Sequence, residues 1–248
     1  EVQGKVAFKD VVFAYDPEKP VLRGVNFSIE PGQCIAVVGA TGAGKSTLIN
    51  LLNRFYEIEK GAIEIDDVDI RQMTLKGLRT HISVVLQDVF LFADTIEKNI
   101  TLGNPNITLD TVIKAAKAIG VHEFINALPG GYHFEINERG STLSSGQRQL
   151  ISFLRAYVAN PSILILDEAT SSIDTYAEQL IQRATEKITE GRTSIIIAHR
   201  LATVQKADVI LVMDQGQVVE RGSHEELISQ KGMYYQLYQA QFAVLSEA

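Results

Sequence analysis

A glycine-rich segment between an apolar run and a helical pattern constrains this chain more than any other feature. Residues 39–47 have the sequence GATGAGKST and fit the pattern G-x-x-x-x-G-K-[ST]. Residues 34–38 before it predict a buried strand, and residues 47–52 at its end predict a helix. In such an arrangement backbone N–H groups and the helix dipole favour an anion. The segment therefore predicts an α/β domain that binds the phosphates of a nucleoside triphosphate.

Each position of this phosphate-binding loop (residues 39–47) has an expected role. We expect Lys45 to reach the β- and γ-phosphates and the Ser46 hydroxyl to coordinate Mg²⁺. The other residues expected to surround the phosphates are Gly39, Thr41, Gly42, Ala43, Gly44 and Thr47.

Bulk composition excludes several classes of protein. The 248 residues are 46% hydrophobic, which is enough for one large domain with a subdomain. The formal net charge of −7 argues against a nucleic-acid partner, because proteins that coat nucleic acid usually carry a basic balance. No apolar run approaches the about 18 residues of a membrane span, and no signal peptide opens the sequence. The single cysteine, Cys34, excludes an internal disulfide framework and suits the cytosol.

The pattern along the chain predicts two kinds of sheet and a helical insertion. Alternating apolar residues from Val6 to Ile29, extended by residues 62–65, predict an antiparallel sheet. Continuous apolar runs predict a parallel sheet covered on both faces: residues 82–86, 163–166, 194–198 and 209–212. Helical patterns dominate residues 88–160, notably at 109–116 and 144–159, and residues 223–245 predict two short amphipathic helices. We expect strand-like structure from Val2 onward.

These patterns predict one domain over residues 1–248. Residues 1–87 and 161–248 would form an α/β core with an antiparallel subdomain, and residues 88–160 a helical subdomain.

Two carboxylates follow the apolar run at residues 163–166. Asp167 is suited to the Mg²⁺ coordination sphere, and Glu168 to a general base that orients the attacking water. The alternative, a solvated strand end, is disfavoured by the four preceding apolar residues and by the phosphate-binding loop. The guanine-reading pattern N-K-x-D is absent from the sequence, which argues against a GTPase.

A third motif identifies the family. The signature segment, residues 143–147 with the sequence LSSGQ, lies ahead of Asp167. It strongly resembles the signature motif of ATP-binding-cassette (ABC) ATPases. The motifs follow that family's order over essentially the whole chain, so the resemblance implies the family's P-loop fold and an ATP-hydrolysing activity.

The resemblance implies roles for residues that their own patterns leave undecided. According to the resemblance, Tyr15 matches an aromatic residue that stacks on adenine. Gln87 matches a glutamine that senses both Mg²⁺ and a transmembrane partner. Residues 171–174 match a loop that crosses a dimer interface, and His199 matches a histidine that contacts the γ-phosphate. The implied catalytic residues are Lys45, Gln87, Glu168 and His199. The implied Mg²⁺ ligands are Ser46, Gln87 and Asp167.

The signature segment lies at a predicted helix start, where N–H groups and a serine hydroxyl can bind phosphate. In the family, Ser144, Gly146 and Gln147 meet the γ-phosphate held by another subunit, so two domains enclose two ATP molecules. Ser145 stands where the commonest family form has glycine. Its hydroxymethyl group can crowd the phosphate or donate to it, which leaves homodimer and heterodimer both open.

Two further segments are similar to exporter-type members of the family. One is the coupling segment, residues 87–100, whose apolar side chains resemble a surface that grips a membrane domain. The other is the triplet Glu138-Arg139-Gly140. The alternatives are that Phe90 and Phe92 belong to the core and that Glu138 and Arg139 form a surface ion pair. The exporter resemblance implies a transmembrane domain absent from this chain and a place at the cytoplasmic face of a cell membrane.

Two other functions compete with an exporter motor. A regulatory cassette would bind ATP without useful hydrolysis, but such cassettes typically lose the glutamate or histidine that this chain keeps. Soluble ABC ATPases of DNA repair or translation carry long coiled-coil insertions or two cassettes, and this sequence has neither.

Overall fold

The computed structural model describes residues 1–137, 142–168 and 173–241. The chain divides into two compact units. The first comprises Glu1–Ile82, Ser162–Glu168 and Gly191–Ala248, and the second Ser83–Pro161 and Ala169–Glu190. Among the described residues, no helix combines the length and the apolar character that a membrane span needs.

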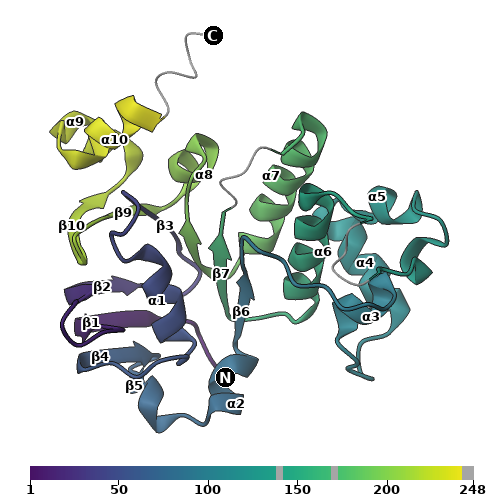
Figure 1. Cartoon of the computed structure of the whole chain (residues 1–248), viewed down its shortest axis with the longest axis horizontal. Helices are drawn as coiled ribbons and strands as arrows, with labels where there is room; N and C mark the ends of the chain where they lie inside the picture. The colour runs from purple at the N-terminus through teal and green to yellow at the C-terminus, as the bar shows by residue number, and fades with distance from the viewer. Residues whose placement is uncertain (138–141, 169–172, 242–248) are drawn as a thin grey trace. The chain divides into compact units, whose positions relative to one another are not determined.

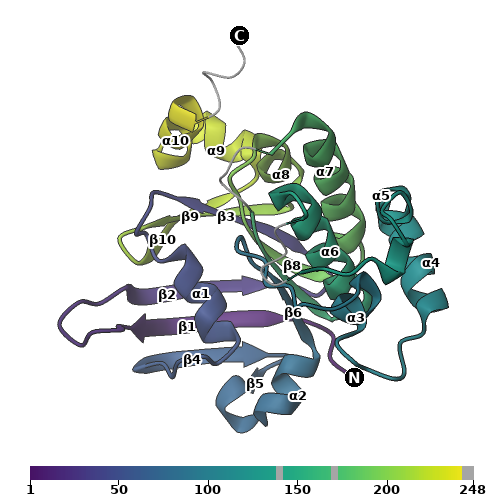
Figure 2. The same ribbon diagram turned by 45° about the vertical axis from the view of Figure 1, so that its right-hand side comes forward.

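The first unit contains the predicted antiparallel sheet. Its four strands have the order β2-β1-β4-β5, and three of them lie side by side as long arrows in Figure 2. The strands are β1 (Val6–Phe13), β2 (Leu22–Ile29), β4 (Lys60–Ile65) and β5 (Val68–Asp69). Phe8 pairs with Phe27 across β1 and β2, and the two rings stack with centroids 4.6 Å apart. The prediction of strand-like structure from Val2 onward is wrong at its start, because the first strand, β1, begins only at Val6.

The first unit also contains most of the predicted parallel sheet. Five of its strands follow one another in the order β10-β9-β3-β8-β7. They are β3 (Cys34–Gly39), β7 (Ile163–Asp167), β8 (Thr193–Ile197), β9 (Val209–Asp214) and β10 (Gln217–Gly222). β3 pairs in parallel with β8 and β9, and β7 with β8, while β10 runs antiparallel to β9. Residues 163–166 are almost fully buried, as expected for strands of a covered sheet.

Short helices complete the first unit. They are α1 (Lys45–Leu52), the 3₁₀ turn η1 (Ile70–Gln72), α2 (Leu75–Thr80), α8 (Leu201–Lys206), α9 (His224–Gln230) and α10 (Met233–Gln241). The two predicted C-terminal helices are α9 and α10, drawn in yellow in Figure 1. Residues 242–245, to which the prediction extended, lie outside the described residues. The Glu220 carboxylate accepts from the N–H groups of Met233 and Tyr234, both at 2.8 Å, and so fixes the start of α10.

The second unit is mainly helical. Its elements are α3 (Ile96–Thr101), α4 (Leu109–Ile119), α5 (His122–Asn126), the 3₁₀ turn η2 (Gly131–His133), α6 (Ser145–Val158) and α7 (Thr175–Thr189). Strand β6 (Ile82–Val85) leads into it. α6 lies beside α7 in both views (Figure 1, Figure 2). The insertion is not entirely helical, because Thr95 and Glu135 form an antiparallel β-bridge that closes the loop between them.

Candidate active site

Three chain segments expected to carry the chemistry meet at one edge of the first unit's parallel sheet. β3, β8 and β7 are adjacent and parallel, so their carboxyl ends share an edge. The phosphate-binding loop follows β3, and Glu168 follows β7 directly. His199 lies two residues after β8. The sheet topology thus brings together the groups predicted to bind phosphate and activate water.

The phosphate-binding loop presents the open N-terminus of α1. Gly44 is the N-cap and has φ 101°, and no side chain accepts a hydrogen bond from the first turn. A Cβ at Gly44 would lie 2.8 Å from Leu22 Cδ2, so both conformation and packing require glycine. The first N–H groups of a helix lack intrahelical partners and therefore favour an anion. Thr41, Gly42 and Ser46 are exposed at this end of the helix.

The Lys45 ammonium folds back over the loop and donates to the carbonyl oxygen of Gly39. Burial lowers the pKa of Lys45, and the nearby Asp167 carboxylate acts in the opposite direction. A cation held over the loop beside a carboxylate is arranged to contact a terminal phosphate.

Glu168 is the one carboxylate that is buried in the described part of the chain, with 8% of its surface exposed. Its Oε2 accepts from the backbone N–H of His199 at 2.7 Å and of Arg200 at 3.0 Å. Its Oε1 accepts from the Thr203 hydroxyl. Burial raises the pKa of the Glu168 carboxyl, and these hydrogen bonds act in the opposite direction. A raised pKa brings the group toward the basicity that a general base needs near neutral pH.

His199 is half-buried at the same edge. Burial and the positive charge of Lys45 both lower the pKa of its imidazole. The neutral ring can therefore accept or donate a hydrogen bond without adding a second cation beside Lys45.

Tyr15 lies just beyond β1 and is anchored to α1. Its hydroxyl lies 3.2 Å from Thr47 Oγ1 and accepts from Asn50 Nδ2 at 2.8 Å. The ring meets Phe13 and Tyr56 edge-on, with centroids 4.8 and 4.9 Å away. Because 47% of Tyr15 is exposed, the ring offers an aromatic surface beside the phosphate-binding loop on which a flat ring can stack.

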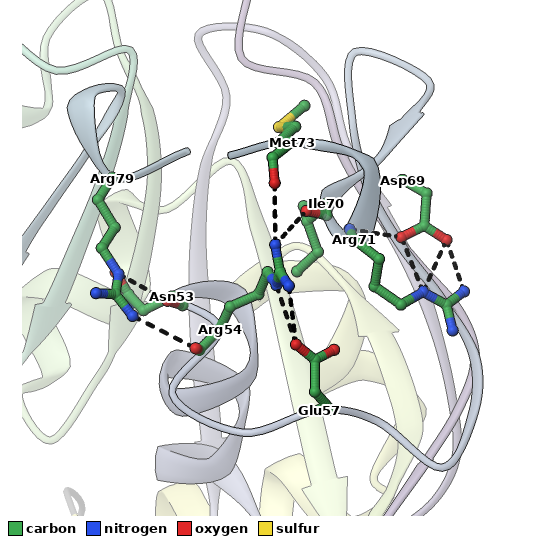
Figure 3. Close-up of polar contacts among 8 residues, drawn as sticks. All are labelled: Asn53, Arg54, Glu57, Asp69, Ile70, Arg71, Met73 and Arg79. Carbon is green, nitrogen blue, oxygen red and sulfur yellow. Dashed lines mark hydrogen bonds and ion pairs between the residues drawn. The ribbon is translucent and has the colours of Figure 1, made fainter. Parts of the chain in front are cut away.

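The opposite end of α1 is fixed by arginines that the sequence analysis did not single out (Figure 3). The Arg79 guanidinium donates to the carbonyl oxygens of Asn53 and Arg54, at 3.2 and 3.4 Å. Arg54 in turn donates to the carbonyls of Ile70 and Met73, at 3.2 and 3.0 Å. Asn53 is the C-cap of α1, so the Arg79 cation lies just past the C-terminus of the helix, where a positive charge complements the dipole and steadies the helix that carries the loop.

The signature segment begins α6 in the second unit. Ser144 is the N-cap: its hydroxyl accepts from the Gln147 N–H at 3.1 Å, and Gln147 Oε1 accepts from the Ser144 N–H at 3.0 Å. Ser145 is exposed, whereas Gly146 is buried. A Cβ at Gly146 would lie 2.8 Å from Ala177 Cβ and 2.9 Å from Ile173 Cγ2, so this glycine allows close packing with the start of α7.

The coupling segment presents an exposed aromatic pair in the second unit. Phe90 is 68% exposed and Phe92 52%, with ring centroids 4.9 Å apart, so the alternative that they belong to the core is wrong. Gln87, half-buried, lies two residues after β6.

Two polar side chains, one buried and one half-buried, hold this segment in place. Fully buried Asn99 accepts from the Phe92 N–H at 2.8 Å and donates to the Phe92 carbonyl at 3.0 Å. Arg155 of α6 donates to the carbonyls of Asn99 and Phe90, at 2.7 and 3.2 Å. α6 therefore connects the signature segment to the backbone beneath the aromatic pair, an arrangement that the sequence pattern did not indicate.

Some predicted residues lie outside the described residues, namely the triplet 138–140 and positions 171–172. Asp174, at the end of the second segment, is the N-cap of α7 and accepts from the Ala177 N–H at 2.9 Å. The described part of the chain has no group of three or more His, Cys, Asp or Glu side chains placed to hold a metal ion. Ser46 and Asp167 supply oxygen donors, the type that Mg²⁺ prefers when phosphate and water complete its shell.

Comparisons with known proteins agree with this geometry. Residues 22–171 match the family model described as ABC transporter. The chain is 51% identical to a fatty acid ABC transporter ATP-binding/permease protein of Mycobacterium tuberculosis, covering 96% of this chain and 38% of that protein. It is 48% identical to an ATP-dependent lipid A-core flippase of Saccharophagus degradans, covering 97% and 41%.

A solved structure shows the same fold. A bacterial Atm1-family ABC exporter with ATP bound superposes with a TM-score of 0.90 at 42% identity, covering 97% of this chain and 42% of that one. The chain thus spans about two fifths of the relatives that it matches. These matches confirm the predicted fold class and the resemblance to exporter-type members, and the chain belongs to the ABC transporter family.

Proposed function

We propose that this chain is the motor domain of an exporter, binding and hydrolysing ATP with Mg²⁺ to drive transport through a transmembrane domain outside the chain. The observation that carries the proposal is the convergence of the phosphate-binding loop, Glu168 and His199 at one edge of the parallel sheet. The family and the names of its exporter relatives support it.

Each group at that edge has a role in the proposed reaction. The backbone N–H groups of the loop and Lys45 hold the phosphates, and the Tyr15 ring stacks on adenine. Glu168 orients and polarises the attacking water, while His199 and Lys45 stabilise charge that develops on the γ-phosphate. Ser46, Asp167 and Gln87 are the proposed Mg²⁺ ligands, and the ion would neutralise phosphate charge when bound.

A second copy, or a similar partner domain, completes the site in this proposal. The signature residues Ser144, Gly146 and Gln147 of one domain contact the ATP held by the other. The exposed Phe90 and Phe92 support the coupling segment as the contact with a transmembrane domain. Such an assembly places this domain at the cytoplasmic face of a membrane.

Replacing the proposed base tests the chemistry. Glu168→Gln keeps the side-chain size but removes the basic carboxylate, so we expect ATP affinity to persist while turnover falls about 10²- to 10⁴-fold. Binding is measured by calorimetry and turnover by phosphate release. Glu64→Gln, on β4 and paired with Lys9, is the matched control and should keep the rate. Equal turnover in the Glu168→Gln and unmodified chains would refute the assigned base.

The dependence of rate on protein concentration tests the partner. If two copies complete each other's sites, ATPase activity per chain rises with concentration at saturating Mg²⁺ and ATP. A flat, near-zero rate with tight ATP binding would instead favour a different partner domain or a regulatory cassette that does not hydrolyse. The same experiment shows whether a signature segment with Ser145 supports turnover.

A further inference from the structure

The proposed base is held by the segment that follows β8. We call residues 199–203 the switch segment. It donates three hydrogen bonds to the Glu168 carboxylate, two from the backbone N–H of His199 and Arg200 and one from the Thr203 hydroxyl. Both carboxylate oxygens are engaged by this one segment.

The contact is shielded from water. Thr203 is 5% exposed and Glu168 8%, so the carboxylate has little room for a water molecule. The Glu168 N–H also donates to the Ile197 carbonyl at 3.1 Å, which fixes the backbone from which the side chain extends. Hydrogen bonds to a charged acceptor are stronger than neutral ones, and stronger again when buried.

A base that activates water must offer that water an oxygen within hydrogen-bond reach. In the arrangement seen here the switch segment donates to both oxygens and takes three of the about four acceptor positions of a carboxylate that is only 8% exposed. The same segment carries His199. We therefore propose, on the basis of the proposed function, that Thr203 is a positioning residue that holds Glu168 in a resting position. Loosening of the switch segment frees the carboxylate for water in the same movement that directs His199 to the γ-phosphate.

The test removes the Thr203 hydroxyl while keeping the side-chain shape. Thr203→Val cannot donate to Glu168, so the resting contact weakens and kcat for ATP rises about three- to tenfold with KM unchanged. Thr203→Ser retains the donor and returns kcat toward that of the unmodified chain. The matched control is Thr185→Val, since Thr185 is equally buried but donates to the Ile181 carbonyl of its own helix. This control should show no rise in kcat.

A second measurement is independent of activity and of nucleotide. Urea unfolding is compared for the unmodified chain, Thr203→Val, Glu168→Ala and the double variant. Because Thr203 is expected to act through Glu168, Thr203→Val should destabilise the unmodified chain more than the Glu168→Ala chain. Equal losses in the two backgrounds would overturn the proposed contact, even if Thr203→Val proved too unstable for kinetics.

The outcomes separate this inference from the proposed function. A fall or no change in kcat for Thr203→Val, together with the expected loss for Glu168→Gln, overturns the resting role of Thr203 alone. Full turnover by Glu168→Gln overturns the proposed base and this inference with it. A rise for Thr203→Val, reversed in Thr203→Ser and absent from Thr185→Val, supports the inference.

Discussion

The N-termini of α1 and α6 are both proposed to meet phosphate, yet they are built differently. At α1 the N-cap is Gly44, and no side chain satisfies the first turn. At α6 the N-cap is Ser144, and a reciprocal pair with Gln147 satisfies two donors without any ligand. The N–H groups that begin α1 have no side-chain partner, whereas at the start of α6 the Gln147 N–H is already satisfied by a side chain.

This difference fits the roles proposed for the two helix ends, with α1 binding ATP within one chain and α6 contacting the ATP held by another domain. A helix end with open donors and a lysine nearby can bind ATP within one chain. A self-capped end is stable before any partner arrives, and the Ser144 hydroxyl, which accepts one hydrogen bond, can still donate its own hydrogen to a phosphate. We therefore expect perturbations at α1 to affect ATP binding, and perturbations at α6 to affect stability and turnover in the assembled site.

The largest expected effect comes from removing the cation at α1. Lys45→Ala leaves the loop glycines in place but removes the charge that is proposed to contact the terminal phosphates. We expect ATP to bind about 10- to 100-fold more weakly, because a charged hydrogen bond is lost, and hydrolysis to fall below detection. Calorimetric titration of the isolated chain measures the affinity, with exposed Lys60→Ala on β4 as the control. An unchanged affinity would show that the open helix end binds ATP without Lys45.

The glycine of α6 should affect stability. Gly44 is required by its positive φ, whereas Gly146 is helical and is required by the close approach of Ala177 and Ile173. Gly146→Ala forces these neighbours apart and should lower the free energy of unfolding by about 1–3 kcal/mol. Denaturant unfolding measures this, and Ser145→Ala, at the adjacent exposed position, should change stability little. Equal stability of the two variants would contradict the packing explanation.

Much of this architecture could be predicted because its signals are local. Continuous apolar runs located β3, β7, β8 and β9, and alternation located β1, β2 and β4. β10 was missed, since only half of its side chains are even partly buried and the opposite face is exposed. The Thr95–Glu135 bridge was also missed, because a pairing across about 40 residues depends on tertiary structure and leaves no periodic pattern.

In the candidate site, too, local features could be predicted from the sequence and long-range contacts could not. The loop, Asp167, Glu168 and His199 could be placed at one sheet edge because each follows a strand that the sequence predicts. The contact between Thr203 and Glu168 could not, since it joins residues 35 apart through a side-chain donor. Nor could Arg155, whose guanidinium supports carbonyls of Asn99 and Phe90. Such long-range side-chain contacts, whether to another side chain or to the backbone, are set by packing and leave no trace in composition or spacing.

The smallest and most discriminating effect concerns the self-capped end. α9 begins with a capping box of the same kind, in which Ser223 accepts from the Glu226 N–H at 3.2 Å. Ser144→Ala and Ser223→Ala should therefore cost similar stability, about 0.5–2 kcal/mol each in urea unfolding.

Only Ser144→Ala should also lower the ATPase rate, because in the proposed assembly its hydroxyl donates to the phosphate held by another subunit. The loss should appear in kcat at protein concentrations where the unmodified chain is active, while ATP affinity of the separate chain stays the same. Ser144→Thr keeps both the cap and the donor, and should retain more of the rate than Ser144→Ala. If Ser223→Ala slows turnover as much as Ser144→Ala, the serine of α6 acts only as a cap. The two helix ends would then differ in stability alone, and the phosphate contact of the signature segment would rest on its backbone N–H groups.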